Sequence, residues 1–242
     1  MNSSEPQKDR KDAKAMTTRR IVIEINFNNY GMNPNRLTQA WIEDRLDIFH
    51  QYTLKSLKKQ TNQNVITVVK LAEGCKEIVE EALQKAEPYP ENIIFGTSHE
   101  SKQTIEAYIQ GFDELYVARQ DSDDLYHESF VQQLHDYQHQ PTTEVLINQE
   151  GYMWDTVDNR FVPIYFESPQ YYTFIYTTKE YLDGKRYVLP GGHGYAIKLP
   201  HEILQHRNFV NIVHPSITSK KRVPKKDGFN PEDMNRILDE FM

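Results

Sequence analysis

Residues 115–124 read LYVARQDSDD, a short apolar run followed by three carboxylates within four positions. The apolar part has the length and composition of a buried β-strand. Carboxylates so close together repel one another unless they reach water or share a cation. Hard divalent cations prefer such oxygen ligands, often with substrate phosphates completing the shell. The stretch therefore predicts a strand that ends at a metal site.

Strands and helices alternate on the N-terminal side of this acidic segment. The predicted strands are 21–25, 65–71, 92–95 and 114–119. The predicted helices between them are 38–60, 76–86 and 98–111. This alternation favours an α/β fold with a mostly parallel sheet and helices on both faces. Ligands bind beyond the carboxyl ends of such strands, which is where Asp121, Asp123 and Asp124 lie.

The second half of the chain is richer in β-structure. The predicted strands are 144–147, 160–166, 172–176 and 208–213. Pro163 suits an edge position or a bulge, because proline has no N–H for a neighbouring strand. A glycine-rich loop occupies residues 190–194, and a short helix is expected after Pro200.

Composition excludes several classes of protein. The net charge is −7 and the isoelectric point is near 5.7, so general nucleic-acid binding is not expected. The single cysteine, Cys75, excludes an internal disulfide and a cysteine-based zinc cage. No stretch approaches the roughly 20 apolar residues of a membrane span, and no apolar signal-peptide core is present. A soluble, cytoplasmic protein is expected.

Two segments resemble motifs of a known family. Residues 45–61 resemble R-x-x-x-F-x-x-x-T-L-x-S-L-x-x-Q-T, and residues 119–131 resemble R-x-D-[SA]-D-D-x-x-x-x-x-F-V. With the alternating architecture, they resemble the GT-A (Rossmann-like) fold of nucleotide-sugar glycosyltransferases, and within it a rhamnosyltransferase-like bacterial group. The resemblance implies metal-dependent transfer of a sugar from a nucleotide-diphosphate sugar to a glycan or another hydroxyl acceptor. Many related enzymes carry an acidic residue after the second strand to hold the nucleotide base. Here that stretch reads Lys70-Leu71-Ala72-Glu73, so the resemblance does not assign the residue that recognises the base.

The resemblance also implies an organisation of the chain. Residues 19–226 are expected to form one GT-A domain, with a nucleotide-binding half at 19–124 and a β-rich acceptor half at 125–226. Residues 1–18 are polar and charged, which predicts a disordered tail. Residues 227–242 are predicted to contain a small amphipathic helix.

The expected cation is Mn²⁺ or Mg²⁺, bridging the diphosphate of the donor. Asp123 is the expected direct ligand, with Asp121 beside it, and Asp124 either supports them or caps the following helix. His214, directly after a predicted strand, is the expected third ligand. His193 is its rival and could instead bind the acceptor. The alternative is a solvated acidic turn at a helix start.

Further residues are expected at the donor and acceptor. The expected nucleotide-sugar-binding residues are Asn26, Phe27, Arg45, Arg119, Asp121, His193, Lys220 and Lys221. Arg45 could instead lock the loop by a salt bridge, and the two lysines could belong to a solvated loop. An inverting transferase needs a base near the acceptor hydroxyl, for which Glu150 and Asp155 are the candidates. A retaining enzyme would need neither.

Two other functions fit parts of the pattern. A nucleotidyltransferase could use a similar sheet and cation, but such enzymes usually have a loop rich in glycine and basic residues after the first strand. Residues 26–31 contain one glycine and no lysine or arginine. A non-catalytic carbohydrate-binding protein with a relic site would bind no nucleotide.

Overall fold

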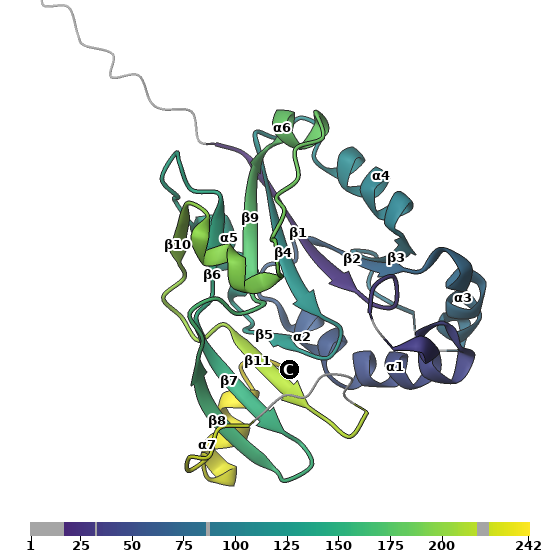
Figure 1. Ribbon diagram of the computed structural model, residues 1–242, viewed down its shortest axis with the longest axis vertical. Coiled ribbons are helices and arrows are strands. Elements are labelled where there is room, and N and C mark those ends of the chain that lie inside the picture. The colour runs from purple at the N-terminus through teal and green to yellow at the C-terminus, as the bar shows by residue number, and fades with distance from the viewer. Residues whose placement is uncertain (1–16, 32, 86–87, 217–222) are drawn as a thin grey trace, which may run out of the picture.

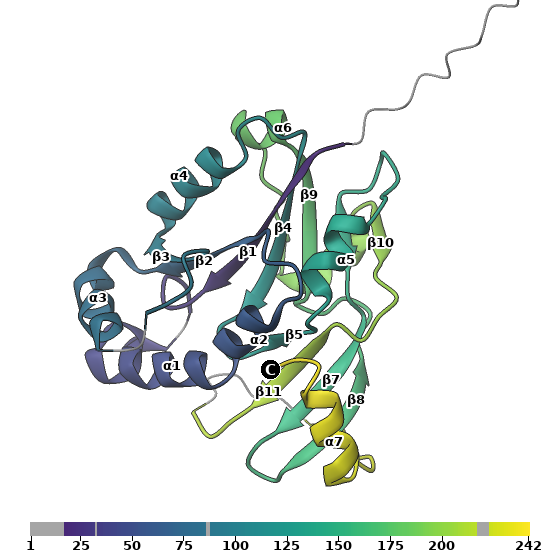
Figure 2. The same cartoon turned by 180° about the vertical axis from the view of Figure 1, so that it is seen from behind.

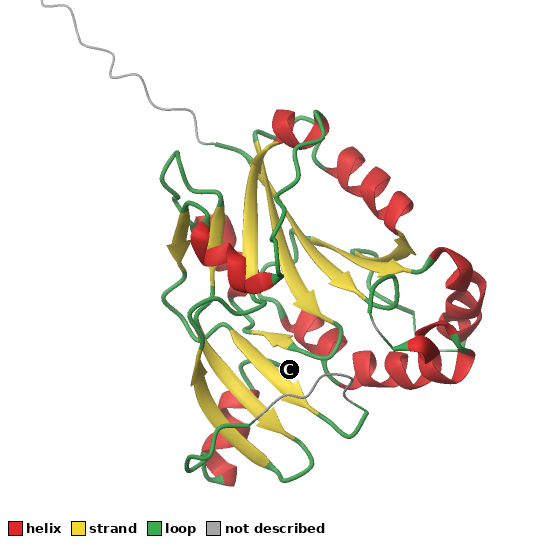
Figure 3. Ribbon diagram, in the orientation of Figure 1, coloured by secondary structure: helices red, strands yellow, loops and turns green. Residues whose placement is uncertain are grey.

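The computed structural model describes residues 17–31, 33–85, 88–216 and 223–242 (Figure 1). A seven-stranded sheet and a four-stranded sheet lie beside each other (Figure 3). The predicted tail lies outside the described residues up to residue 16. Thr18 is held by Asp113. The backbone N–H of Thr18 donates to Asp113 Oδ2 at 2.8 Å, and the Thr18 hydroxyl donates to the same oxygen at 2.9 Å. Among the described residues, no helix has both the length and the apolar character to cross a membrane.

The large sheet contains the strands of the alternating first half. Its spatial order is β10 (His201–Ile203), β6 (Val145–Ile147), β9 (Tyr172–Thr177), β4 (Glu114–Asp121), β1 (Arg19–Asn26), β2 (Ile66–Leu71) and β3 (Ile93–Thr97). β1 is parallel to β2 and β4, and β2 is parallel to β3. β9 is antiparallel to both β4 and β6. The sheet is therefore mixed and mainly parallel, as predicted.

Helices cover both faces of this sheet. Ile21, Ile23 and Ile25 on one face of β1 pack with the first group of helices, and Val22 on the other face packs with the second. The first group is α1 (Gln39–Gln51), α2 (Thr53–Lys59), α3 (Lys76–Gln84) and α5 (Phe130–Asp136). The second group is α4 (Ser98–Tyr108) and α6 (Thr178–Leu182). For α1 to α4, right-handed crossovers explain this division, because the chain moves across the sheet in one direction from β1 to β3 and in the other from β3 to β4.

The small sheet comes from the second half of the chain. Its order is β5 (Leu125–Tyr126), β11 (Phe209–Val213), β7 (Glu150–Asp155) and β8 (Arg160–Tyr165). Helix α7 (Pro231–Leu238) lies against it (Figure 2) and packs Met234, Ile237 and Leu238 into the core. Short 3-10 helices occur at Pro34–Leu37, Glu73–Cys75 and His193–Lys198.

The predicted helix at 38–60 is broken at Tyr52, where φ is −121° and ψ is −79°. The break separates α1 from α2. The buried hydroxyl of Thr53 donates to the carbonyl of Asp124 at 3.0 Å, and that of Ser56 donates to the carbonyl of Tyr126 at 2.8 Å. These long-range bonds accompany an interruption that helical periodicity does not show.

Strands β5, β7 and β10 were not predicted from the sequence. Residues 150–155 form β7, for which no strand was predicted. The helix predicted after Pro200 is wrong, because residues 201–203 form β10 beside β6. Glu202 helps hold β10 there by accepting hydrogen bonds from the Tyr137 hydroxyl at 2.9 Å and the Gln140 N–H at 2.8 Å. The edge position predicted for Pro163 is confirmed, since β8 ends the small sheet.

Gly151 on β7 provides a test of packing in the small sheet. A Cβ at this position would lie 2.5 Å from the ring of Phe209, which is fully buried and stacked on Tyr171. We expect Gly151→Ala to lower the free energy of unfolding by about 1–3 kcal/mol, because the ring has little room to move. Urea denaturation measures this. Gly74→Ala is the control, since nothing lies within 4 Å of its Cβ, and equal stability of the two variants would contradict the prediction.

Candidate active site

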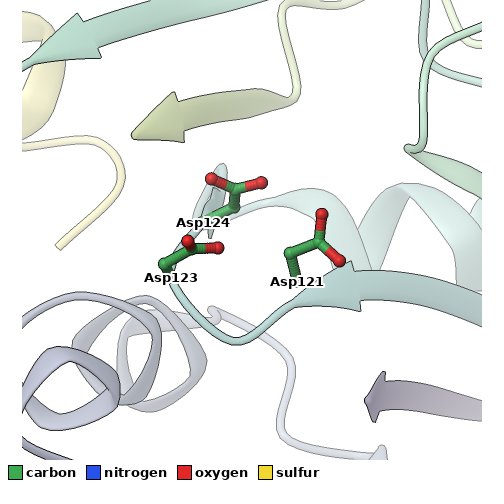
Figure 4. A group of neighbouring side chains, drawn as sticks. All are labelled: Asp121, Asp123 and Asp124. Carbon is green, nitrogen blue, oxygen red and sulfur yellow. The ribbon is translucent and has the colours of Figure 1, made fainter. Parts of the chain in front are cut away.

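The acidic turn lies where β4 and β1 end side by side. Asn26 at the end of β1 pairs with Asp121 at the end of β4. The chain leaves β1 toward β2 on one side, whereas β4 lies on the other side. This makes the turn the topological switch point of the sheet, the place where open α/β sheets bind ligands. Figure 4 shows the three carboxylates that gather there.

Asp124 is fully buried and serves as an acceptor for groups of the protein. Its Oδ2 accepts a hydrogen bond from the Tyr171 hydroxyl at 2.5 Å and one from Asn211 Nδ2 at 3.2 Å. Its Oδ1 accepts a bond from the backbone N–H of Ile212 at 2.9 Å. Burial, and then the nearby Asp124 carboxylate, raise the pKa of the Tyr171 hydroxyl, which stays protonated and donates. Asp124 therefore joins the turn to β11 and to the segment before β9.

Asp123 is also buried, but its partners are basic side chains. Arg45 Nη2 on α1 and His214 Nε2 after β11 each lie 3.2 Å from Asp123 Oδ2. Arg45 Nε also donates to the hydroxyl of Ser122 at 3.0 Å. Of the two roles considered for Arg45, the structure shows the loop-locking salt bridge. His214 meets the turn although it lies 91 residues away in the chain.

Asp121 is the most exposed of the three, with 29% of its side chain accessible. Arg119 Nη2 donates to its Oδ1 at 2.6 Å, and Arg119 Nη1 donates to the carbonyl of Gln170 at 3.1 Å. Burial opposes the charge on the guanidinium, but the carboxylate of Asp121 and neighbouring tyrosines outweigh it, so the pKa of Arg119 is raised. Arg119 thus connects Asp121 to the segment before β9.

The first sequence motif holds the second motif in place. The side chains of the first motif that bind the second are those of Arg45, Thr53 and Ser56, described above, and that of Gln60. Gln60 Nε2 donates to the carbonyl of His127 at 2.8 Å, and Gln60 Oε1 accepts from the N–H of Val131 at 3.0 Å. The motif positions the acidic turn and the start of α5 through hydrogen bonds to their backbone. This positioning role of residues 45–61 was not predicted from the sequence.

The donor set suits a hard divalent cation. One carboxylate oxygen from each of Asp121, Asp123 and Asp124 lies within 4.8 Å of the others. Both oxygens of Asp124 already accept hydrogen bonds from the protein, so Asp121 and Asp123 are the better candidate ligands. One or two carboxylates together with substrate phosphates are a common ligand set for Mg²⁺.

The two candidate bases lie at opposite ends of β7. Asp155 is at the end that faces the acidic turn, since it pairs with Val213 directly before His214. Glu150 starts the strand, about 17 Å away at 3.4 Å per residue, and pairs with Arg207 at 3.2 Å. Asp155 Oδ1 accepts the N–H groups of Val157 at 3.0 Å and Asp158 at 3.2 Å. Asp155 therefore closes the turn that follows its strand.

The other predicted donor-binding residues differ in their access to the site. Asn26 lies beside Asp121, and its Oδ1 accepts a bond from Asn29 at 3.2 Å. Phe27 is buried in the core with its ring against Trp41 and Phe95, so only its backbone is at the strand end. Lys220 and Lys221 lie outside the described residues.

A further ion pair near the site, between Lys70 and Glu24, was not predicted from the sequence. Lys70 Nζ lies 3.0 Å from Glu24 Oε2, and Glu24 pairs in register with Arg119 across β1 and β4. Charged side chains therefore extend from Lys70 to Asp121 along the carboxyl-terminal part of one sheet face. The available signal was Glu24 itself, a lone charge within the apolar run 21–25.

The fold and the acidic switch point are those of a GT-A-like glycosyltransferase. A family model described as "Putative rhamnosyl transferase" matches residues 34–160, and because it covers more than half of the chain, the protein belongs to this family. The matched range contains both motifs and the acidic turn. No curated protein matches the chain.

Three of the solved structures that match the chain are distantly similar to it. A putative nucleotide-diphospho-sugar transferase from Desulfovibrio desulfuricans G20 has 15% identity and a TM-score of 0.34, with 81% of each chain covered. The 4-diphosphocytidyl-2C-methyl-D-erythritol synthase of Anaerococcus prevotii DSM 20548 has 14% identity and a TM-score of 0.34, covering 84% of this chain and 92% of that one. The inositol-1-phosphate CTP transferase of T. maritima has 12% identity and a TM-score of 0.32, covering 84% and 93%. Likenesses at this level carry no argument about activity.

The different surroundings of the aspartates predict different effects on stability. Asp124→Asn replaces one accepting oxygen with an NH₂ group that faces donors, so it should lower the free energy of unfolding by about 1.5–3 kcal/mol. Asp121→Asn loses one partly exposed ion pair and should cost less than about 1 kcal/mol. Urea unfolding followed by circular dichroism compares them. The opposite order would contradict the structural role of Asp124.

Proposed function

We propose that this glycosyltransferase moves a rhamnosyl group from a nucleotide-diphosphate sugar to a hydroxyl group of a glycan or another acceptor, using Mn²⁺ or Mg²⁺ at Asp121 and Asp123. The observation that carries the proposal is the pair of carboxylates at the switch point with two guanidinium groups beside them. The family to which the chain belongs supports the sugar. The switch-point position supports a nucleotide ligand.

The chain supplies positive charge where the reaction develops negative charge. Breaking the bond between the sugar and the diphosphate leaves an electron pair on a phosphate oxygen. When bound, a divalent cation would neutralise part of that charge. Arg45 from α1 and Arg119 from β4 would stabilise the rest through hydrogen bonds to phosphate oxygens. Lys220 and Lys221 remain sequence-based candidates for the same task.

Cation and nucleotide should bind together. In the structure, Arg119 already compensates Asp121, while Arg45 and His214 contact Asp123. A cation arriving alone would compete with these partners. A diphosphate arriving with it gives the displaced guanidinium groups new acceptors, so each ligand should strengthen the binding of the other. His214, already beside Asp123, is the candidate third ligand.

Thermal unfolding tests this coupling. A panel of dTDP-, UDP- and GDP-rhamnose is titrated with and without Mn²⁺, at concentrations up to 100-fold above the dissociation constant. One nucleotide with Mn²⁺ should raise the Tm by roughly 5–10 °C, well beyond the sum of the shifts from either ligand alone.

Asp123→Ala should remove this Mn²⁺-dependent stabilisation and reduce release of nucleoside diphosphate at least about 100-fold. Asp239→Ala is the matched control, because that carboxylate lies on the surface near the end of α7 with 85% of its side chain exposed. The proposed function would be overturned if no nucleotide of the panel raised the Tm of the wild-type protein. It would also be overturned if Asp123→Ala kept the full Mn²⁺-dependent stabilisation and the wild-type release of nucleoside diphosphate.

A further inference from the structure

His193 is held in the glycine-rich loop by two contacts with one residue. Its Nδ1 lies 3.1 Å from the carbonyl oxygen of Ser168, and its own carbonyl accepts the Ser168 hydroxyl at 2.8 Å. Gly191 and Gly192, with φ of 81° and 96°, make the left-handed turn that brings the loop to this position. The loop is thus anchored beside the segment that precedes β9.

The contact with Ser168 decides the tautomer of His193. A carbonyl oxygen can only accept, so the Nδ1 atom must carry the proton. In the neutral ring, Nε2 then presents an unprotonated lone pair. Among the described residues, Nε2 has no hydrogen-bond partner, and the side chain is open to solvent. This is the state in which a histidine can receive a proton from a ligand.

A series of hydrogen bonds and chain neighbours leads from His193 to the acidic turn. Ser168 is two residues before Gln170, whose carbonyl accepts a bond from Arg119, and Arg119 binds Asp121. The electrostatics agree with this placement. Partial desolvation of the ring, and then the charge of Arg119, lower the pKa of His193, whereas Asp121 acts in the opposite sense. The ring is therefore neutral at neutral pH and lies within electrostatic reach of Asp121.

The carboxylates predicted as bases are placed less favourably. Glu150 is at the far end of β7 and pairs with Arg207. Asp155 is at the near end, but it accepts two backbone N–H groups of its own turn. The Oδ1 atom of Asp155 is therefore already engaged by its own turn. Nε2 of His193 has no such bond to any residue that the structure describes.

We propose that His193 is the general base that activates the acceptor hydroxyl. This inference rests on the proposed function. The acceptor O–H proton passes to Nε2 as the acceptor oxygen forms its bond to the anomeric carbon. The bond from that carbon to the diphosphate oxygen breaks, and its electron pair leaves with the nucleoside diphosphate. His193 then releases the proton to water, and the configuration at the anomeric carbon is inverted.

The test compares His193→Ala with His201→Ala. His201 is a matched control, because it is also exposed and also has Nδ1 against a backbone carbonyl, that of Leu199 at 2.9 Å, but it lies on the edge strand β10. Nucleoside diphosphate release is measured with Mn²⁺ and the rhamnose donor that stabilises the wild type. Simple aryl glycosides serve as acceptors, and water serves in their absence.

His193→Ala should lower kcat by about 10²–10⁴-fold, the usual contribution of a general base. Its Mn²⁺-dependent thermal stabilisation by the nucleotide should be unchanged. Added imidazole should restore part of the activity, because the side chain is exposed and a free base can replace it. His201→Ala should retain the wild-type rate.

The pH profile gives an independent readout. Protonation removes the lone pair, so kcat/KM of the wild type should fall as the pH drops through the pKa of His193, which lies below its ordinary value of 6.5. Burial lowers this pKa most, and of the charged groups that act on the ring, Arg119 lowers the pKa and Asp121 raises it. The acidic limb should be absent in His193→Ala.

Each failure has a separate meaning. If His193→Ala keeps the wild-type rate and still binds the donor, His193 is not the general base, and the proposed function still stands. Loss of Mn²⁺-dependent nucleotide binding in that variant makes His193 a ligand of the donor site and also overturns the base. A wild-type protein that neither binds nor turns over any rhamnose donor overturns the proposed function and this inference together.

Discussion

The buried carboxylate of Asp124 is the interaction on which the arrangement of the two sheets depends. It binds Tyr171 ahead of β9 and Asn211 and Ile212 on β11, so one side chain joins the end of β4 to both sheets. A buried carboxylate without donors is costly, which means that these partners must assemble as the chain folds. The stacking of Phe209 on Tyr171 carries the same contact into the small sheet. The acidic turn is therefore held in place by the second half of the chain as well as by its own strand.

The acidic turn is also held in place by residues of α1 and α2 and the segment directly after α2. Arg45, Thr53, Ser56 and Gln60 all reach the stretch from residue 122 to 131, with mainly backbone atoms as their partners. Side chains that bind a backbone set its path whatever residues it carries. The two sequence motifs are thus parts of one structure, in which the first holds the second rigid. A rigid ligand set loses less entropy when a cation and a diphosphate bind, and this preorganisation favours catalysis.

Sequence periodicity was most informative for the first half of the chain. The apolar run at 21–25 and the helical spacing around it are local signals, and the strands and helices were found close to where they were expected. The failures share a different origin. The break at Tyr52, the strand β7 and the short strand β10 are stabilised by partners distant in the chain. A segment of three residues, such as β10, has no period of its own to detect.

The sequence by itself determined that a buried strand runs into an acidic turn at the carboxyl edge of a mostly parallel sheet, because alternation and apolar runs are properties of neighbouring residues. The sequence could not assign different roles to the three aspartates of the turn. Tertiary structure made Asp124 a structural acceptor and left Asp121 and Asp123 as candidate ligands, through partners contributed by α1, β11 and the segment before β9. It also placed Glu150 and Asp155 at opposite ends of one strand. The role of a carboxylate depends on burial and on nearby charges, and both are properties of distance in space.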